Sequence, residues 1–245
     1  MPSPRPRRVA VFGAGGGIGA ALVAQLISRD DVGEVFALSR TAPPVPADTR
    51  GKRVPLAFDL TDEASIAAAA ARIAAPLDLC IIATGILTLP DGTGPEKGAR
   101  QIDPAAMARV FALNTIGPAL IAKHLLPLLP RDRPSVFAAL SARVGSIGDN
   151  RMGGWHSYRA SKAALNMLVR NFAIELGRTH RLAICVGLHP GTVDTGLSAP
   201  FQRGVPAEQL FTPELSAAHL LRVIDGLTPA DSGGCFAWDG ARIEP

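Results

Sequence analysis

The chain has 245 residues, of which 47% are hydrophobic and 19% are charged, and this composition excludes an intrinsically disordered protein. It is long enough to bury a full core, so we expect a single domain over residues 1–245. The formal net charge is +4, but the lysines and arginines form no stripe interleaved with aromatic residues, so a nucleic-acid partner is not expected.

The first thirty residues put a basic segment before an apolar one, as a secretory signal does. Five glycines interrupt the apolar part, no clean cleavage site follows it, and no uninterrupted apolar run approaches the ~18 residues of a membrane span. The cysteines Cys80, Cys185 and Cys235 lie far apart in apolar runs, without the spacing of metal ligands. We therefore expect a cytoplasmic protein with reduced, buried cysteines, no metal site and no membrane partner.

In chain order, short apolar runs alternate with longer stretches of helical period. The predicted strands are 7–13, 34–39, 53–58, 77–84, 134–141, 181–188 and 234–238, and the predicted helices are 17–29, 62–74, 104–128, 157–177 and 213–225. The proline-rich stretch 41–51 is interpreted as a loop. This alternation is typical of βαβ units. We predict a doubly wound (Rossmann) α/β fold, in which helices cover both faces of a single parallel sheet of about seven strands.

A glycine cluster lies between the first strand and the first helix. Gly13, Gly17 and Gly19, with Ile18 between the last two, follow the spacing GxxxGxG. Residues without Cβ let the backbone approach a pyrophosphate, whose charge is then met by free N–H groups at the helix start. The alternative is a glycine-rich turn that serves packing only, but the position within the opening βαβ unit favours a dinucleotide site.

The end of the second strand bears on the choice of cofactor. It carries Ser39 and Arg40, without the carboxylate that would accept from a ribose 2′-hydroxyl. An arginine there suits a 2′-phosphate, so we expect NADP(H) rather than NAD(H), although Arg40 could also be a solvated loop cation. Asp59 and Leu60 follow the third strand, and Asp59 could accept from the adenine amino group or cap the helix that begins near Asp62.

Tyr158 is the only tyrosine of the chain, and Lys162 follows four residues later in a segment of helical period. The two side chains therefore share one helix face. An ammonium close to a phenol favours the phenolate, so we expect a lowered pKa for Tyr158 and exchange of a proton with a carbonyl or alcohol oxygen. Taken alone, the pair could simply be a core tyrosine beside a solvated lysine, and the glycine cluster is what favours an acid/base beside a nicotinamide.

Three segments together resemble the short-chain dehydrogenase/reductase family: GAGGGIG at 13–19, YRASK at 158–162 and PGTVDT at 190–195. The run 141–166 is most similar to the C-factor-like, or cell-signalling, subgroup of that family. The resemblance implies that Tyr158 is the catalytic acid/base and that Lys162 lowers its pKa and holds the nicotinamide ribose. It also implies further cofactor contacts from Ile18, Thr84, Gly85, Pro190, Gly191, Val193 and Thr195.

Asn114 matches the active-site asparagine of the same family. Pro118, four residues later, has no N–H for the carbonyl of residue 114, so a helix over 104–128 would open there. The carbonyl could then hold a water that passes protons to Lys162. The alternative is a simple proline kink around a polar surface residue.

The sequence departs from the family pattern at three places. Residues 82–85 replace the usual Asn-Asn-Ala-Gly, and Phe12 stands where a threonine is typical. At the end of the fifth strand, Ala142 stands where the family has the serine that steadies the substrate oxygen. Ser141 is the candidate catalytic serine if the strand bulges; otherwise Ser146 or a water supplies the hydrogen bond, or reduction is slow.

The outer pocket is less defined by sequence. Trp155, Met152 and the segment 196–214 lie where the family closes its substrate pocket, and this segment is interpreted as a mobile lid. His156 and Arg203 are expected to be cleft or surface side chains rather than a second acid and an anion site.

The sequence therefore predicts an NADP(H)-dependent oxidoreductase that transfers hydride between nicotinamide and a small-molecule carbonyl or secondary alcohol. The family resemblance implies that the helices at 104–128 and 157–177 pair with partner subunits in a homodimer or homotetramer. The alternative function is a nucleotide-sensing, C-factor-like signalling protein with little or no turnover.

Overall fold

The computed structural model describes residues 5–41, 51–74 and 76–245. Within them, eight strands form one sheet: β1 (Arg7–Phe12), β2 (Val32–Ser39), β3 (Arg53–Ala57), β4 (Leu79–Ile82), β5 (Ser135–Leu140), β6 (Ala183–His189), β9 (Cys235–Ala237) and β10 (Arg242–Ile243). The order across the sheet is β10-β9-β6-β5-β4-β1-β2-β3, and every neighbouring pair is parallel except β9 and β10. The predicted doubly wound α/β fold is confirmed.

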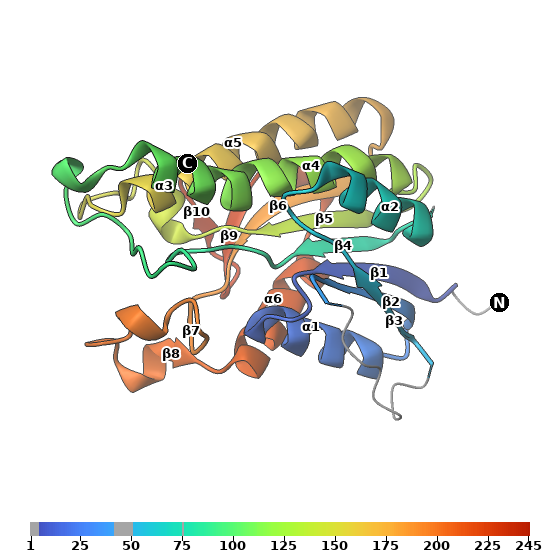
Figure 1. The fold of residues 1–245 in the computed structure, drawn as a ribbon. Helices are drawn as coiled ribbons and strands as arrows, with labels where there is room; N and C mark the ends of the chain where they lie inside the picture. Colours follow the sequence, from blue (N-terminus) through green and yellow to red (C-terminus); the bar gives the residue numbers. More distant parts are fainter. Residues whose placement is uncertain (1–4, 42–50, 75) are drawn as a thin grey trace.

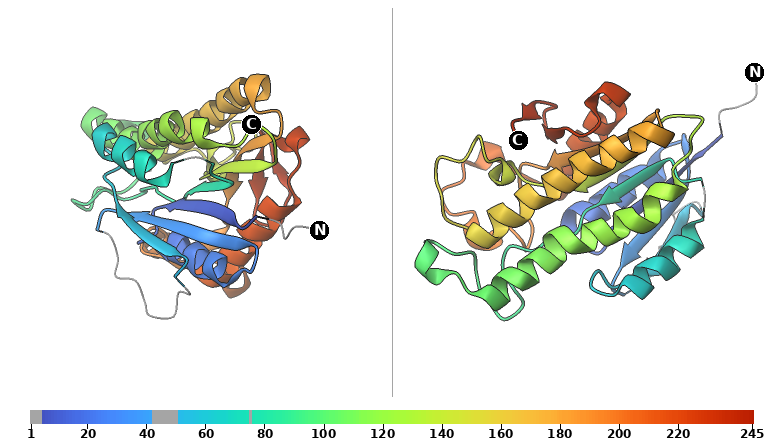
Figure 2. Two further views of the ribbon diagram at one scale, coloured as in Figure 1. Left: turned by 90° about the vertical axis from the view of Figure 1, so that its right-hand side faces the viewer. Right: turned by 90° about the horizontal axis from the view of Figure 1, so that it is seen from above.

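Helices cover both faces of this sheet, as Figures 1 and 2 show. On one face lie α1 (Gly17–Ser28) and α6 (Pro213–Gly226). On the other lie α2 (Glu63–Ile73), α4 (Gly117–Leu125) and α5 (His156–Thr179), and α3 (Pro104–Phe111) leads into α4. In the right-hand view of Figure 2, α4 and α5 run alongside each other over most of their length. The long helix that carries Tyr158 therefore packs directly on the sheet.

Alternate residues of the central strands enter two separate apolar cores. In β1, Val9 and Val11 face α1 and α6, whereas Ala10 and Phe12 face the layer of α2, α4 and α5. Cys80 and Cys185 are buried in the second of these cores. Each central strand is thus apolar on both faces, which explains the nearly continuous apolar runs in the sequence.

Local side chains fix where three of the six described α-helices begin. Asp62, Asp103 and Thr212 accept hydrogen bonds from backbone N–H groups in the first turns of α2, α3 and α6. The cap of α1 is Gly16, which offers no side-chain acceptor, and the first turn of α1 has no acidic residue. The N-terminus of α1 therefore keeps backbone N–H groups for another partner.

The helix predicted over 104–128 is interrupted. A π-helical turn at Ala112–Ile116 joins α3 to α4, and a 3-10 turn at Leu126–Leu128 ends the run. Pro118 explains the interruption, because it cannot donate to the carbonyl of Asn114 and the ladder must widen there. The expected opening of the helix at Asn114 is confirmed.

The run Pro104–Leu128, with a mean hydropathy of 1.4, is the helical stretch among the described residues that is long and apolar enough to cross a membrane. It contributes Ile121, Ala122 and Leu125 to the core beneath α2 and α5. Core helices of globular proteins pass the same test of length and composition, so the run is weak evidence for a membrane span.

Three short strands were not predicted from the sequence. β7 (Thr192–Val193) and β8 (Leu210–Phe211) pair with each other outside the main sheet, and β10 adds an antiparallel edge. The loop predicted over 41–51 falls mostly on 42–50, outside the described residues.

Candidate active site

The glycine cluster forms a tight turn between β1 and α1. Gly13 has φ +92°, in the left-handed region that favours glycine. A Cβ on Gly13 would lie 2.8 Å from the carbonyl carbon of Ala83, and a Cβ on Gly19 would lie 2.1 Å from the carbonyl oxygen of Gly13. A Cβ on Gly17 would lie 2.8 Å from Cγ2 of Thr195. Only glycine lets these segments come so close, and the turn leaves the N-terminus of α1 open to an anion.

A first cavity of about 640 Å³ lies beside this turn. The predicted cofactor residues that line it are Gly13, Ser39, Arg40, Asp59, Leu60, Thr84 and Gly85. Arg40 is exposed at the end of β2, and Ser39 donates to the carbonyl of Thr41 at 2.7 Å. The Oγ1 atom of Thr84 is buried without a partner, as is expected of a polar group that a bound ligand can satisfy.

Asp59 does not cap α2. Its Oδ1 atom accepts from the N–H and the hydroxyl of Thr61, at 2.8 and 2.7 Å, and these bonds hold the pKa of Asp59 below its usual value. The cap of α2 is Asp62, which accepts from Ala64. The capping alternative for Asp59 is therefore wrong, and its carboxylate faces the first cavity.

A second cavity of about 270 Å³ adjoins the first, because Ala83, Thr84 and Gly85 line both. The predicted site residues that line it are Ile18, Ser141, Tyr158, Lys162, Pro190, Gly191, Val193 and Thr195, besides Thr84 and Gly85. Gly17, Gly19 and Asn114 line neither cavity and pack behind the walls. Together the two cavities follow the carboxyl ends of the parallel strands, the usual ligand-binding edge of an open α/β sheet.

Tyr158 and Lys162 lie one turn apart on α5, and both side chains are buried. Nζ of Lys162 donates to the carbonyl oxygen of Leu140 at 2.8 Å and lies 5.9 Å from the centroid of the Tyr158 ring. Gly145 permits this packing, because a Cβ there would lie 2.7 Å from Cβ of Lys162. The ammonium is thus held between the end of β5 and the phenol.

The protonation states of this pair follow from burial. Burial raises the pKa of Tyr158 to about 12 and lowers the pKa of Lys162 to about 8. The expected lowering of the Tyr158 pKa is wrong for this structure, because withdrawing a phenolate from water outweighs its attraction to an ammonium that donates to Leu140. At neutral pH, Tyr158 carries its proton and Lys162 is mainly charged. The pair is therefore suited to giving a proton.

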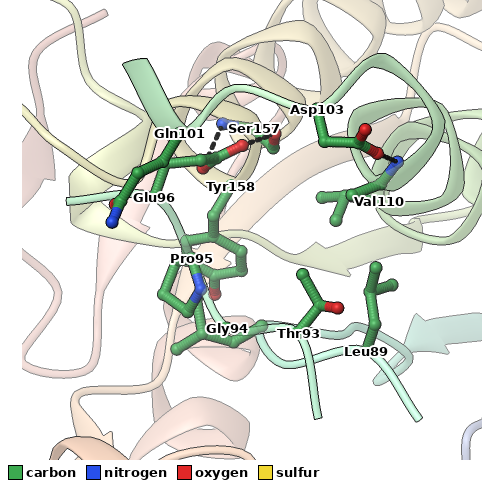
Figure 3. Close-up of a pocket in the computed structure, with 12 residues that line it drawn as sticks. Leu89, Thr93, Gly94, Pro95, Glu96, Gln101, Asp103, Val110, Ser157 and Tyr158 are labelled. Atoms are coloured by element: carbon green, nitrogen blue, oxygen red, sulfur yellow. Dashed lines mark hydrogen bonds between the residues drawn. The ribbon is translucent and has the colours of Figure 1, made fainter. Parts of the chain in front are cut away.

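The loop before α3 fixes the first turn of α5, as Figure 3 shows. Both carboxylate oxygens of Glu96 accept from Ser157, one from its N–H at 3.1 Å and the other from its hydroxyl. The carbonyl of Glu96 accepts from the N–H of Trp155 at 2.5 Å. Burial works to raise the pKa of Glu96, but the hydrogen bonds from Ser157 hold it below its usual value. Sequence reasoning missed Glu96, since 61 residues separate it from Ser157.

The chain enters α5 through a left-handed run. Gly153, Gly154 and Trp155 have φ of +63°, +64° and +50°. A tryptophan is rarely found in this region, at a cost of about 1–2 kcal/mol. The bond from its N–H to Glu96 and contacts of its ring with Tyr158 and Phe201 hold it there, with centroids 6.2 and 5.1 Å apart.

The side chain of Asn114 links two segments of the chain by hydrogen bonds. Oδ1 accepts from the N–H of Ile86 at 2.8 Å, and Nδ2 donates to the carbonyl of Ile86 at 2.9 Å and to Oγ of Ser161 at 3.2 Å. The side chain is fully buried. Asn114 therefore ties the loop after β4 to α5, next to Gly85. The water expected at its backbone carbonyl stays a prediction.

The serines near the end of β5 form hydrogen bonds with other residues of the protein. Ser141 donates to Oδ1 of Asn166 at 2.6 Å, although it lines the second cavity. Ser146 accepts from the N–H of Asp149 at 3.0 Å and does not line that cavity. Ala142 packs against Tyr158. Ala142 therefore occupies the place expected for the serine, and the catalytic role of Ser141 stays a prediction.

Apolar side chains form the outer wall of the second cavity. They include Leu87, Val144, Trp155, Leu197, Phe201 and Val205, of which the last three come from the predicted lid. Met152 is exposed, as is Arg203. No group of three or more His, Cys, Asp or Glu side chains within the described ranges could hold a metal ion.

The sequence profile of the short chain dehydrogenase family matches residues 7–205. The chain belongs to this family. As a short-chain dehydrogenase, it is an NAD(P)-dependent oxidoreductase that acts on CH–OH or carbonyl groups.

Relatives of this short-chain dehydrogenase include enzymes and a signal protein. It is 34% identical to the 1-hydroxy-2-glutathionyl-2-methyl-3-butene dehydrogenase of Rhodococcus sp. strain AD45, over 96% of this chain and 98% of that one. It is 36% identical to the C-signal protein of Myxococcus xanthus, over 69% of this chain and 92% of that one. The NADPH-bound carbonyl reductase from chicken fatty liver superposes with a TM-score of 0.83 at 28% identity, over 98% of this chain and 100% of that one.

Proposed function

We propose that this short-chain dehydrogenase uses NADPH to reduce an uncharged, largely apolar carbonyl compound to a secondary or primary alcohol. The observation that carries the proposal is that Tyr158 and Lys162 line one cavity with the 190–195 loop, next to the cavity of the glycine turn. A proton donor and a dinucleotide groove therefore meet at the carboxyl edge of the sheet.

Three observations support a dinucleotide in this groove, and one favours NADPH. The glycine turn leaves no side chain before the open N-terminus of α1, and the buried Oγ1 of Thr84 lacks a partner between the two cavities. The 190–195 loop lines the second cavity together with Tyr158. Arg40 lines the first cavity at the end of β2, where no carboxylate competes with a 2′-phosphate. When bound, NADPH would supply the hydride.

The residues of the chain would have separate roles in the reduction. Tyr158 would give its proton to the carbonyl oxygen as the carbonyl carbon receives hydride. Lys162 would stabilise the phenolate that remains, because its ammonium already lies beside the ring. Trp155 and Phe201 would close the cavity over the substrate and keep water out.

The lining of the second cavity supports an uncharged substrate. Among the described residues that line it, Lys162 is the only lysine, arginine, aspartate or glutamate, and the outer wall is apolar and aromatic. A charged substrate group would lose its hydration there without a partner. We therefore expect aryl ketones and aldehydes to be reduced more efficiently than keto acids.

Substitution of Tyr158 tests the chemistry. Tyr158→Phe should lower kcat/KM for the reduction of benzaldehyde or acetophenone by about 10²–10⁴-fold, because the proton donor is lost. NADPH affinity, followed by nicotinamide fluorescence, should change little. Unchanged turnover in this variant would refute the proposed function.

Substitution of Arg40 tests the cofactor. Arg40→Ala should weaken NADPH binding by about ten- to a hundredfold, the loss of a charge-assisted bond, and leave NADH binding nearly unchanged. Arg72→Ala is the matched control, since Arg72 is exposed on α2 and lines neither cavity. Equal affinity of the native protein for NADH and NADPH would contradict the NADP(H) preference.

A second candidate function is nucleotide-dependent signalling with little turnover. Two observations favour it: Ala142, which has no hydroxyl, packs against Tyr158, and the chain is 36% identical to the C-signal protein. NADPH binding without turnover of any carbonyl in a broad panel would favour this function over the reductase.

Self-association remains part of the proposal. The helices at 104–128 and 157–177 carry Ile116, Met167 and Ile174, which are 53%, 62% and 48% exposed. Such exposed apolar side chains suit contact with a second copy of the chain. Sedimentation velocity should give a dimer or tetramer.

A further inference from the structure

The reduction proposed above has no second hydrogen-bond donor assigned to the substrate oxygen. Negative charge develops on the substrate oxygen, and a second hydrogen-bond donor beside the proton donor typically contributes about 10²–10³-fold to the rate. Ala142 cannot donate, the hydroxyl of Ser141 donates to Asn166, and the hydroxyl of Ser146, which does not line the second cavity, donates to the carbonyl of Pro245. Another donor is therefore required in the second cavity.

His189, the last residue of β6, meets the geometric requirement. It lines the second cavity together with Tyr158, Lys162 and Ala142. The strands β5 and β6 pair in parallel with Leu140 opposite Leu188, so the chain position of Ser141 is level with that of His189. Figure 1 shows β5 and β6 side by side beneath α5.

The face of the sheet onto which His189 projects follows from its neighbours in β6. Cys185 enters the core beneath α5, and Gly187 has Oδ1 of Asn166, on α5, 3.5 Å from its added Cβ. Side chains alternate along a strand, so His189 projects to the same face as these two residues. It is therefore on the face of α5, the helix that carries Tyr158.

The ring has one buried and one accessible side. Its Nδ1 atom is buried without a hydrogen-bond partner, while the side chain as a whole is only partly buried and lines the cavity. Nε2 is not buried in this way, so it is the ring nitrogen that is open to the cavity. A proton on Nδ1 would be a buried donor without a partner, so the neutral tautomer with the proton on Nε2 is favoured.

Burial and a nearby positive charge keep the ring neutral. Burial and the positive charge of Arg143 lower the pKa of His189 to about 4, against a smaller opposing effect of Asp239. At neutral pH the imidazole can donate a hydrogen bond without carrying a charge that the apolar cavity would penalise.

We propose that His189 is a further catalytic residue of this short-chain dehydrogenase, whose Nε2–H donates a hydrogen bond to the substrate carbonyl oxygen beside Tyr158. This inference rests on the proposed reductase function. His189 keeps its proton throughout, since the proton that ends on the alcohol oxygen comes from Tyr158 and the hydride goes to the carbonyl carbon. The bond strengthens as charge develops on the oxygen, so His189 acts on the rate more than on cofactor binding.

Three substitutions of His189 separate a donor from a packing side chain. Gln places an amide N–H near the position of Nε2, Asn places its amide near Nδ1, and Phe keeps the ring without a donor. In the reduction of benzaldehyde by NADPH, we expect His189→Phe and His189→Asn to lower kcat/KM about 10²-fold, and His189→Gln to stay within about tenfold of the native enzyme. The Kd for NADPH should remain within about twofold in all three.

His180→Gln serves as the matched control, and Tyr158→Phe shows whether a negative result overturns the role of His189 or the proposed function. His180→Gln alters a buried histidine at the end of α5, away from both cavities, and should leave kcat/KM unchanged. The inference alone is overturned if Tyr158→Phe abolishes turnover while His189→Phe retains native turnover, or if the Gln variant loses as much as the Phe variant. If Tyr158→Phe also retains native turnover, the proposed function itself is overturned. Should the Phe variant not fold, the comparison of Asn with Gln decides the same question.

Discussion

Removal of the Glu96 carboxylate should weaken both the fold and the active site. Ser157 is buried, and Glu96 accepts from both its N–H and its hydroxyl. In Glu96→Ala these two donors lose their partner, at about 1–3 kcal/mol each. The first turn of α5 also loses a negative charge, at about 0.3–1 kcal/mol. The expected loss is about 2–7 kcal/mol, a large share of the roughly 5–15 kcal/mol by which a domain is typically stable.

Urea unfolding of the native protein and the variant measures this loss at equal m value. Glu96→Gln keeps one acceptor and should lose about 1–2 kcal/mol. Glu175→Gln, on the exposed side of the same helix, is the control and should stay within about 0.5 kcal/mol. Because Ser157 precedes Tyr158, Glu96→Ala should also lower kcat. A loss below about 1 kcal/mol with unchanged kcat would show that the loop does not hold α5.

Acid adds a second readout for the same contact. The pKa of Glu96 lies below its usual value of 4.5 in the folded chain. The stability that its ionised form contributes is therefore fully present above that usual value and is lost as the pH falls through the lower, folded pKa. The native protein should lose more stability than Glu96→Gln on acidification from neutral pH, and equal losses would argue against an ionised Glu96.

Three further predictions concern the catalytic pair, the glycine turn and the place of the missing hydroxyl. Because the pKa of Lys162 is about 8, kcat/KM for reduction should be level near neutral pH and should fall above about pH 8, where the ammonium is lost. Lys162→Met should be slow at every pH. If this variant kept the native pH profile, Lys162 would not be the group whose titration causes the fall. Gly19→Ala should abolish NADPH binding, measured by fluorescence, because its Cβ would lie 2.1 Å from the carbonyl oxygen of Gly13. Gly177→Ala, with open space around its Cβ in α5, should instead stabilise the protein by about 0.5–1 kcal/mol in urea unfolding. Ala142→Ser should raise kcat/KM more in the His189→Phe variant than in the native enzyme, because the new hydroxyl can replace the lost imidazole donor. Equal effects in both backgrounds would mean that residues 142 and 189 do not both contact the substrate oxygen.

Most of the strands and helices could be predicted from the sequence, because the hydrophobic periodicity and the turn and capping residues indicate the same boundaries along this chain. The seven parallel strands were expected within about two residues of their observed ends, since each is a short apolar run between polar or glycine-rich turns. The helix starts at Asp103 and Thr212 carry their own capping signals. Pro118 predicted that the helix would open at Asn114, because the missing N–H is a local property, and the structure shows this opening as a π-helical turn.

The contacts that were missed are those between distant parts of the chain. Glu96 lies in a loop without period, and its bonds to Ser157 exist only after α5 packs against that loop. Ser141 was the candidate serine only if the strand bulged, and its hydrogen-bond partner Asn166 comes from α5, so the pair could not be predicted from spacing. The raised pKa of Tyr158 has the same origin, because its burial depends on the packing of Ala142 and Leu87 around it.

The run of Gly153, Gly154 and Trp155 has a consequence for where the phenol can be. Its backbone winds in the opposite sense to α5, so the helix cannot grow backwards past Trp155. Changes of length in the preceding segment, 146–152, would be taken up before that reversal and would not shift the helix along its axis. The position of Tyr158 relative to the carboxyl edge of the sheet is therefore independent of the length of the segment 146–152.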